Sequence, residues 1–534
     1  MRGRPDRQRL FAFLFQKTLK PAEICGLRGI NGLGARPPSV MESTATPSNQ
    51  AGESAESLAS KVRSAVIWRS GSQILAQIVQ WAATFLVIRI LSPADYGLFA
   101  MTGVVMVFLN MLNGYGLASG LVQQKDITPR HVRQLFGMLI LLNVTLGGVQ
   151  FLTAPWVAAY YHQPEVAHLL RAQSAFYLLT PFAALAYALL SREMDFAKQA
   201  RINILASIAS AATALFGALA GWGVWTLIAA PAALYIVKAI GMTAAARSLV
   251  RPSFDFRGAG SIARFGGVMA AGQLFWFLQS QCDVFIAGRS FSAHELGIYT
   301  ESLFLTQIFV AKFVPPLNEV AFSAYARIQH DDAAVARAFV RATRIIMIAA
   351  LPFYFGLAAT AEPLVLTMLG DKWAESIPIV HLLAFAMPFM TMQVLFSPAC
   401  DARGKPSIGM KNGAFGAAVL AASFLVGVHW GPTGIAAAWI VAYPVYLAVS
   451  MWRSLPVIGA KLRDVADAVA PPLLAAVAMA LVVTLVDHAL PPLPPFPRLA
   501  LLASTGAAVY GLWLATFSRH VVREIIELVR LRRG

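Results

Sequence analysis

The stretch ILSPADYGLF at residues 90–99 decides the fold, because its pattern recurs as SFSAHELGIY at residues 290–299. The offset of 200 residues also aligns positions just before these stretches. The aligned pairs are Gln73 with Gln273, Arg89 with Arg289, Ser92 with Ser292, Asp95 with Glu295, and Gly97 with Gly297. In both copies an acid, Asp95 or Glu295, stands in the loop position SPADYG or SAHELG, where it is predicted to cap the next helix. The sequence therefore predicts an internal repeat.

Long apolar stretches flank both copies. Apolar residues make up 57% of the 534 residues, charged residues only 13%, and the mean hydropathy is +0.62. Runs of about 20 apolar residues can cross a hydrocarbon core of about 30 Å as helices, which satisfy their own backbone hydrogen bonds. The pattern predicts an all-α polytopic membrane protein with about 14 transmembrane helices. The predicted spans are roughly 65–91, 95–122, 132–154, 166–190, 202–220, 223–246, 262–288, 296–322, 341–361, 377–400, 411–429, 432–453, 466–487 and 498–518.

Lysine and arginine residues gather in alternate connections between these spans. Counted from the first span, the even-numbered connections and the C-terminal tail carry 25 of them, whereas the odd-numbered connections carry four. Those four are Arg89, Arg289, Lys372 and Arg498. Because basic residues stay on the cytoplasmic side of membrane proteins, both termini and the even-numbered connections are predicted to be cytoplasmic. The net charge of +17 then reflects topology, and no nucleic acid partner is expected.

The repeat divides the chain into two bundles. Each copy belongs to a set of six spans, and because six is even the two sets have the same orientation in the membrane. This predicts a parallel repeat related by a pseudo-two-fold axis along the membrane normal. The predicted parts are a disordered cytoplasmic tail at 1–60, six-helix bundles at 61–255 and 256–460, helices 13 and 14 at 461–518, and a basic cytoplasmic tail at 519–534. Met41 is an alternative start, and an amphipathic surface helix is an alternative to disorder in the first tail.

Polar residues inside the spans are candidate functional residues, because a charge at the bilayer centre costs about 3 kcal/mol on insertion scales. The ionisable candidates are Arg69, Arg171, Lys238, Asp283, Glu301, Lys312 and Glu319. The first span carries a polar stripe of Arg69, Gln73, Gln77 and Gln80, and its repeat partner carries Gln273 and Asp283 on one side. A hydrogen-bonded helix seam is the alternative for the stripe. Snorkelling to the membrane surface is the alternative for Arg69, Arg171 and Lys238, and pairing with a neighbouring helix is the alternative for Asp283.

The eighth predicted span combines both signs of charge. Glu301 and Lys312 lie on one face of it, separated by about 16 Å of helix rise. Glu319 returns to the same face two turns further on. Between them stand Pro315 and Pro316, and this proline pair predicts an interruption that would allow the helix to bend.

Features of enzymes and metalloproteins are absent from the sequence. It contains no hydrolase, metalloprotease or phosphate-loop motif, and the longest outer connections, 362–378 and 487–498, are too short to form catalytic domains. Cys25, Cys282 and Cys400 have neither disulfide nor metal-ligand spacing, so no cofactor is expected. An aromatic belt near the outer span ends is predicted for Trp156, Trp222, Trp225, Trp373 and Trp430.

Several of these segments resemble a known family of membrane transporters. The resemblance rests on W-x-x-x-x-Q at 68–73, RILSPADYGLFAM at 89–101, GLASGLVQQKDIT at 116–128 and FSAHELGIYTESLFL at 291–305. With these segments the chain, over about 60–460, resembles the polysaccharide transporter branch of the multidrug/oligosaccharidyl-lipid/polysaccharide exporters. That branch contains the Wzx-type flippases of lipopolysaccharide and exopolysaccharide assembly.

The resemblance implies that two six-helix bundles enclose a cavity that opens alternately to each side of the bacterial cytoplasmic membrane. It implies that a polyprenyl-diphosphate-linked oligosaccharide passes from the inner to the outer leaflet, and that polysaccharide polymerase and glycosyltransferases are partners. In-span cations suit the diphosphate and glutamines suit sugar hydroxyls. The expected substrate-binding residues are therefore Arg69, Gln73, Gln77, Gln80, Arg171, Lys238, Gln273 and Lys312. The expected carriers of a coupling ion are Asp283, Glu301 and Glu319.

Three other functions stay open. A drug or cation antiporter of the same superfamily predicts acids in the N-terminal bundle, yet the first six spans hold no central Asp or Glu. A membrane-embedded polysaccharide-assembly enzyme predicts a sizeable outer connection with acidic or Arg/His clusters. A scaffold of the assembly machinery does not explain a repeat with a polar seam, which is typical of transporters.

Overall fold

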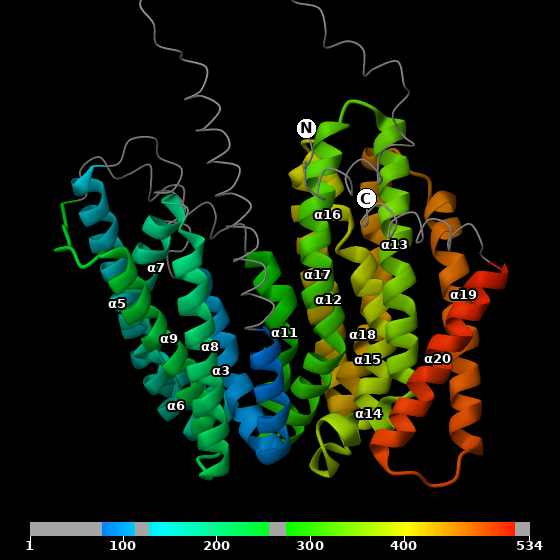
Figure 1. The fold of residues 1–534 in the computed structure, drawn as a ribbon, viewed down its shortest axis with the longest axis horizontal. Coiled ribbons are helices and arrows are strands. Elements are labelled where there is room, and N and C mark those ends of the chain that lie inside the picture. The colour runs from blue at the N-terminus through cyan, green and yellow to red at the C-terminus, as the bar shows by residue number, and fades with distance from the viewer. Residues whose placement is uncertain (1–76, 113–127, 194, 256–273, 518–534) are drawn as a thin grey trace, which may run out of the picture.

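The computed structural model describes residues 77–112, 128–193, 195–255 and 274–517 (Figure 1). Within these residues all regular structure is helical. The N-terminal group of helices consists of Gln77–Ile90, α3 (Pro93–Leu112), α5 (Pro129–Tyr161), α6 (Glu165–Ser174), α7 (Phe176–Arg192), α8 (Phe196–Leu219) and α9 (Trp225–Ala246). The C-terminal group consists of α11 (Leu274–Ser290), α12 (Ala293–Arg327), α13 (Asp332–Ala359), α14 (Ala361–Met368), α15 (Ser376–Gln393), α16 (Phe396–Ala402), α17 (Pro406–Gly427) and α18 (Gly431–Ile458). The last two helices are α19 (Leu462–Ala489) and α20 (Pro495–Phe517).

The helices have the length and composition of membrane spans. In the described part of the chain, ten helical segments are long and apolar enough to cross a membrane. Many large apolar side chains on them face outward, as at Leu152 and Leu485, which are each 70% exposed. Such exposure is costly in water but not in lipid. The prediction of an all-α polytopic membrane protein is therefore confirmed.

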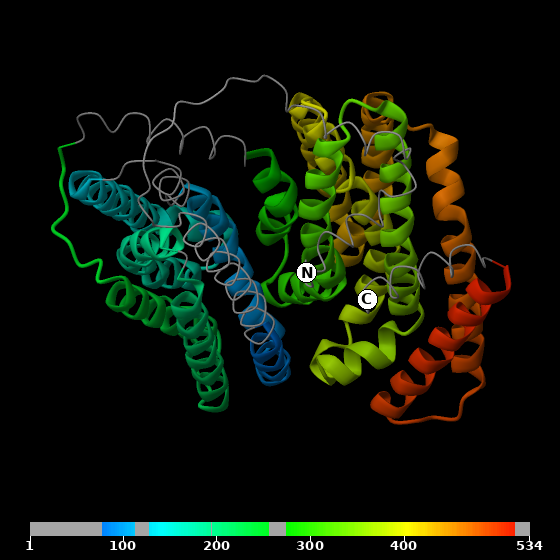
Figure 2. The same cartoon turned by 45° about the horizontal axis from the view of Figure 1, so that its top comes forward.

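The N-terminal and C-terminal groups lie side by side, close together at one end and apart at the other (Figures 1 and 2). The connections 91–92, 162–164, 291–292 and 369–375 lie at the end where the groups meet, which we call the contact end. The connections 247–255, 328–331 and 403–405 lie at the opposite end, which we call the basic end. Helices α19 and α20 pack on the far side of the C-terminal group, where α19 runs along α13.

Ion pairs tie together the connections at each end. At the basic end Arg130 pairs with Asp255 at 2.9 Å, and Arg403 pairs with Asp332. At the contact end Arg498 bonds Asp487 at 2.7 Å and Glu362 at 3.0 Å. Since odd and even connections gather at opposite ends, successive spans cross the structure in alternate directions.

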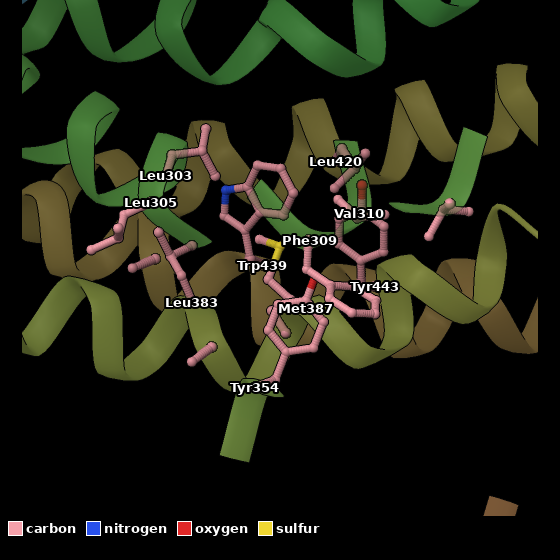
Figure 3. Close-up of a cluster of buried hydrophobic side chains, with 14 of the residues drawn as sticks. Leu303, Leu305, Phe309, Val310, Tyr354, Leu383, Met387, Leu420, Trp439 and Tyr443 are labelled. Carbon is pink, nitrogen blue, oxygen red and sulfur yellow. The ribbon is translucent and has the colours of Figure 1, made fainter. Parts of the chain in front are cut away.

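A large buried cluster fills the C-terminal group (Figure 3). Phe309 of α12 meets the ring of Tyr354 of α13 edge-on at 5.7 Å, and Trp439 of α18 stacks on Tyr443 at 5.1 Å. Met387 of α15 lies among these rings. Lipid is as apolar as these side chains, so close packing rather than removal from water stabilises their association.

The predicted interruption at the proline pair is wrong. Helix α12 continues from Ala293 to Arg327 through Pro315 and Pro316. The two prolines lack N–H groups, but neighbouring helices can satisfy the exposed backbone of a membrane helix. Just beyond the prolines, the side-chain amide of Asn318 donates to the carbonyl of Val394 at 3.2 Å. This bond holds α12 against the end of α15.

Candidate functional site

Helices α3 and α12 begin with equivalent caps at the contact end. The Oγ of Ser92 accepts from the N–H of Asp95 at 3.3 Å, and Asp95 Oδ2 accepts from the Ser92 N–H at 2.9 Å. Ser292 and Glu295 form the same pair of bonds, at 3.2 and 2.9 Å. The prediction that Asp95 and Glu295 cap helices is confirmed. The side chains of both acids are thus engaged in helix caps.

One turn into each helix, α3 and α12 cross at two glycines. A Cβ built on Gly97 would lie 1.7 Å from the carbonyl oxygen of Ala293, and a Cβ on Gly297 would lie 1.8 Å from that of Pro93. Real Cβ atoms essentially never approach a heavy atom closer than 3.0 Å. The backbones therefore touch here, and only glycine fits at either position. The contact is reciprocal, since each partner lies 200 positions from its counterpart.

Side chains from each group also bond to the backbone of the other. From the C-terminal group, Lys372 Nζ donates to the carbonyl of Ile90 at 2.9 Å, and Trp373 Nε1 donates to that of Ile88 at 3.0 Å. These carbonyls lie in the last turn of their helix, where they have no intrahelical partner. Trp373 is fully buried and packs edge-on against Tyr96 at 5.6 Å. Its prediction as an aromatic-belt residue is therefore wrong, because it fills the junction between the groups.

The N-terminal group in turn contacts the backbone and side chains of the C-terminal group. The hydroxyl of Tyr160 donates to the carbonyl of Phe285 at 3.3 Å. The guanidinium of Arg289 lies 4.9 Å above the Tyr160 ring, and Arg89 lies beside Gly370. Arg89, Arg289 and Lys372, which are three of the four basic residues that break the topology pattern, thus all lie where the groups meet. This pattern in the sequence was a signal for the junction.

One pair of predicted substrate-binding residues meets across the two groups. Lys312 Nζ donates to Gln77 Oε1 at 3.3 Å, which joins α12 to the helix Gln77–Ile90. From Lys312 toward the basic end most of α12 is exposed, including Glu319, whereas Glu301 is half-buried nearer the contact end. A charged and exposed face of α12 therefore begins at the Lys312–Gln77 pair.

The other predicted substrate-binding residues are distributed differently. Arg171 of α6 lies 5.3 Å above the ring of Phe151 of α5, within the N-terminal group. Lys238 is half-buried on α9, and Gln80 is half-buried one turn beyond Gln77. Arg69, Gln73 and Gln273 lie outside the described residues. The structure thus brings together Gln77 and Lys312 and keeps Arg171 apart from them.

A buried carboxyl group lies in the C-terminal group. Asp283 of α11 is 1% exposed, and its Oδ2 accepts from the hydroxyl of Tyr299 of α12 at 2.7 Å. The same hydroxyl accepts from Trp439 Nε1 of α18 at 2.9 Å. Asp283 Oδ1 is buried and has no hydrogen-bond partner among the described residues. Sequence reasoning selected Asp283 but missed Tyr299 and Trp439, because both look like ordinary apolar-core residues in their helices.

The described ranges contain no group of three His, Cys, Asp or Glu side chains that could hold a metal ion. Cys282 and Cys400 are free thiols. The candidate functional features of the described residues are therefore Asp283, the Lys312–Gln77 pair and the glycine crossing.

Comparisons with known proteins agree on one group of relatives. A family model described as "Polysaccharide biosynthesis protein" matches residues 86–378. The succinoglycan biosynthesis transport protein ExoT of Rhizobium meliloti is 27% identical over 450 residues, which is 83% of this chain and 91% of ExoT. The lipopolysaccharide biosynthesis protein WzxC of Escherichia coli is 22% identical over 385 residues, which is 70% of this chain and 77% of WzxC.

Solved structures show the same architecture. The lipid II flippase MurJ in an inward closed conformation matches with a TM-score of 0.70 at 13% identity, over 85% of this chain and all of MurJ. An inward-facing multidrug resistance MATE family transporter of the MOP superfamily matches with a TM-score of 0.56 at 15% identity, over 74% of this chain and 98% of the transporter. At these identities the matches establish the fold alone.

Proposed function

The chain belongs to the polysaccharide biosynthesis protein family, and from that premise we propose that it is a flippase for surface polysaccharide assembly. It moves a polyprenyl-diphosphate-linked oligosaccharide from the inner to the outer leaflet of the bacterial cytoplasmic membrane. The names of the relatives support this role, since one is a succinoglycan transport protein and another a lipopolysaccharide biosynthesis protein. The multi-pass helical structure supports transport within the bilayer rather than catalysis outside it.

The observation that carries the proposal is the reciprocal crossing of α3 and α12. Gly97 meets Ala293 and Gly297 meets Pro93, and this reciprocal contact supports a parallel repeat of two six-helix bundles. In this proposal the bundles are 61–255 and 256–460, helices 13 and 14 follow at 461–518, and 14 helices cross the membrane. The tails at 1–60 and 519–534 are cytoplasmic.

Alternating access follows from where the groups touch. Contacts between them concentrate at the contact end and reach the Lys312–Gln77 pair at mid-depth. With the basic end in the cytoplasm, the described arrangement is closed toward the outside. Rocking of the two bundles about the crossing then opens the outer side and closes the inner side.

Substrate binding is assigned to the polar residues near the junction. Lys312 neutralises part of the diphosphate, and Gln77 bonds sugar hydroxyls beside it. Arg69, Gln73, Gln80 and Gln273 share these roles, because they lie on the first span and on its repeat partner. Lys238 lines the N-terminal side. The stacking of Arg171 on Phe151 favours a role near the membrane surface, and Arg171 is the weakest member of the set.

A coupling ion drives the cycle through Asp283, Glu301 and Glu319. Polysaccharide polymerase and glycosyltransferases act before or after this step as partners. The protein itself is not an enzyme in this proposal. An antiporter for drugs or cations, an assembly enzyme and a scaffold are the competing functions.

A deletion strain tests the function. It is complemented with wild type, Lys312→Ala, or the control Lys198→Ala, which removes a lysine paired with Asp195 near the basic end. The strain is expected to lack surface polysaccharide and to accumulate lipid-linked precursor on the cytoplasmic side. Wild type and Lys198→Ala restore the polysaccharide, whereas Lys312→Ala restores it poorly. Precursor that reaches the outer leaflet without the protein, but stays unpolymerised, contradicts a flippase and supports an enzyme or scaffold.

A further inference from the structure

We infer that Asp283 binds one proton in each transport cycle through its Oδ1 atom, and that Tyr299 and Trp439 are the positioning residues that leave this atom for exchange. The inference rests on the proposed function, because a coupling proton has a role only in a transporter.

Hydrogen-bond direction identifies the exchanging atom. A phenol has one proton to donate, and an indole N–H can only donate. Since Trp439 Nε1 donates to the Tyr299 oxygen, the Tyr299 proton goes to Asp283 Oδ2. Oδ2 therefore acts as an acceptor whether the carboxyl group is neutral or ionised. A proton that binds or leaves does so at Oδ1, to which no described residue donates a hydrogen bond.

Burial makes a bound cation necessary. An ionised carboxylate in an apolar interior is strongly unfavourable unless a positive charge or several donors accompany it. Asp283 is 1% exposed, and in the described part of the chain the one side chain that donates a hydrogen bond to it is Tyr299. Within the described ranges the titratable groups that interact with Asp283 are Cys282 of α11, Tyr299 of α12 and Tyr443 of α18, and none of these three is a cation.

A proton fits this pocket better than a metal ion does. Hard metal cations take about six oxygen ligands. Around Asp283 the described side chains provide the indole of Trp439, the phenols of Tyr299 and Tyr443, and the thiol of Cys282. A proton needs only Oδ1. Figure 3 shows Trp439 and Tyr443 packed among apolar side chains such as Leu420 and Phe309, which keeps their side of the pocket dry.

The surroundings of Asp283 are linked through α12 to the α3–α12 crossing, about which the two bundles rock. Tyr299 lies two residues beyond Gly297, which touches α3 of the other group. Rocking at this crossing acts directly on α12, and bending of α12 within the C-terminal group shifts the Tyr299 hydroxyl relative to Asp283 on α11 and Trp439 on α18. The ionised carboxylate depends most on that hydrogen bond, so the position of α12 and proton binding influence each other.

Reconstituted protein tests the inference. Vesicles contain polyprenyl-diphosphate-linked repeat unit extracted from a strain that accumulates it, and impermeant periodate measures the fraction in the outer leaflet. Two rates are compared: flipping driven by an imposed pH gradient, and exchange without any gradient. Pyranine inside the vesicles reports proton movement. The variants are Asp283→Asn, Asp283→Glu and Tyr299→Phe, with Tyr354→Phe as a control, because Tyr354 is equally buried in the same group but bonds Thr391.

We expect the variants to affect flipping driven by a pH gradient and exchange without a gradient differently. In Asp283→Asn the rate of exchange without a gradient stays within about twofold of the wild-type rate, whereas the rate of flipping driven by the pH gradient falls at least tenfold. This variant shows no substrate-dependent proton flux. Asp283→Glu recovers part of the drive. Tyr299→Phe keeps the drive but moves the pH of half-maximal drive upward by about one unit, because the carboxylate loses the hydrogen bond that favours it. Tyr354→Phe leaves the profile unchanged.

Two outcomes overturn the inference. One is pH-driven flipping by Asp283→Asn at the wild-type rate, and the other is drive by a sodium gradient but not by a pH gradient. Retained exchange shows that the variant is folded, and if Asp283→Asn loses exchange, the pH profile of Tyr299→Phe decides instead. Failure of the wild type to exchange any substrate is a different result, which rejects the proposed flippase function.

Discussion

Replacing Gly97 or Gly297 by alanine should force open the contact end. The new methyl carbon would lie 1.7 Å from the Ala293 carbonyl oxygen or 1.8 Å from that of Pro93. Reaching the shortest ordinary separation of 3.0 Å requires the two helices to move apart by about 1.3 Å in the first case. Both obstacles are backbone atoms, so a change of side-chain rotamer cannot relieve the clash.

The energetic cost follows from overpacking. Inserting a methyl group into a tightly packed contact costs about 1–3 kcal/mol. At 1.4 kcal/mol per factor of ten, this lowers the ratio of the closed to the open arrangement by about 5- to 150-fold. If the closed arrangement is only modestly preferred, the open arrangement becomes a major population. The bonds that Lys372 and Trp373 make to the other group weaken at the same time.

Spin labels across the junction measure this change. Labels replace Glu165 on the N-terminal group and Asp371 on the C-terminal group, both of which are exposed at the contact end. Electron–electron distance measurements should show a longer-distance population in Gly97→Ala and Gly297→Ala. Gly103→Ala is the matched control, because a Cβ there on the same helix α3 meets nothing within 4 Å. Equal distance distributions and equal transport in Gly97→Ala and Gly103→Ala would refute the crossing as the point of closure.

Three further predictions concern single side chains. Trp373→Phe leaves a carbonyl of the other group without its donor, so it should lower thermal stability by about 1 kcal/mol and increase the open population seen with the same labels. Arg498→Ala removes the hydrogen-bonded pair with Asp487 and should cost about 1 kcal/mol in a detergent unfolding assay, with a smaller loss at high salt. The nearby Lys198 ammonium holds the pKa of Asp195 below its usual value, so this contact contributes stability at neutral pH that is lost as the pH falls through the lowered pKa. Asp195→Asn, which can still cap α8, should therefore narrow the difference in melting temperature between pH 7 and pH 3, and an unchanged difference contradicts the role of the pair.

The predicted helix caps show what local sequence patterns can establish. Ser92 and Ser292 each precede an acid by three residues, and a capping box needs no other part of the chain. The proline pair shows the limit of the same reasoning. Pro315 and Pro316 break a helix in isolation, yet α12 continues, because the surrounding helices decide whether the freed backbone is tolerated.

The candidate site was predictable in its residue types and less so in its geometry. Lys312 and Asp283 stood out because charges are rare inside membrane spans. Their neighbours did not stand out, since nothing local distinguishes Tyr299 or Trp439 from other aromatic residues of a core. The local sequence also does not distinguish a buried tryptophan near a span end from one at the lipid interface. Trp373 is therefore predicted in the aromatic belt, although it is fully buried between the two groups.

The sequence by itself determined that this is a multi-pass helical membrane protein, and it predicted the alternating spans and an internal repeat. Those properties depend on composition, on the distribution of basic residues and on patterns within a few turns of helix. Only the tertiary structure decided that α3 and α12 cross at Gly97 and Gly297, and that Asp283 accepts a hydrogen bond from Tyr299, which in turn accepts one from Trp439. In lipid the apolar faces of helices are nearly equivalent, so their partners are chosen by shape and by a few hydrogen bonds between distant residues.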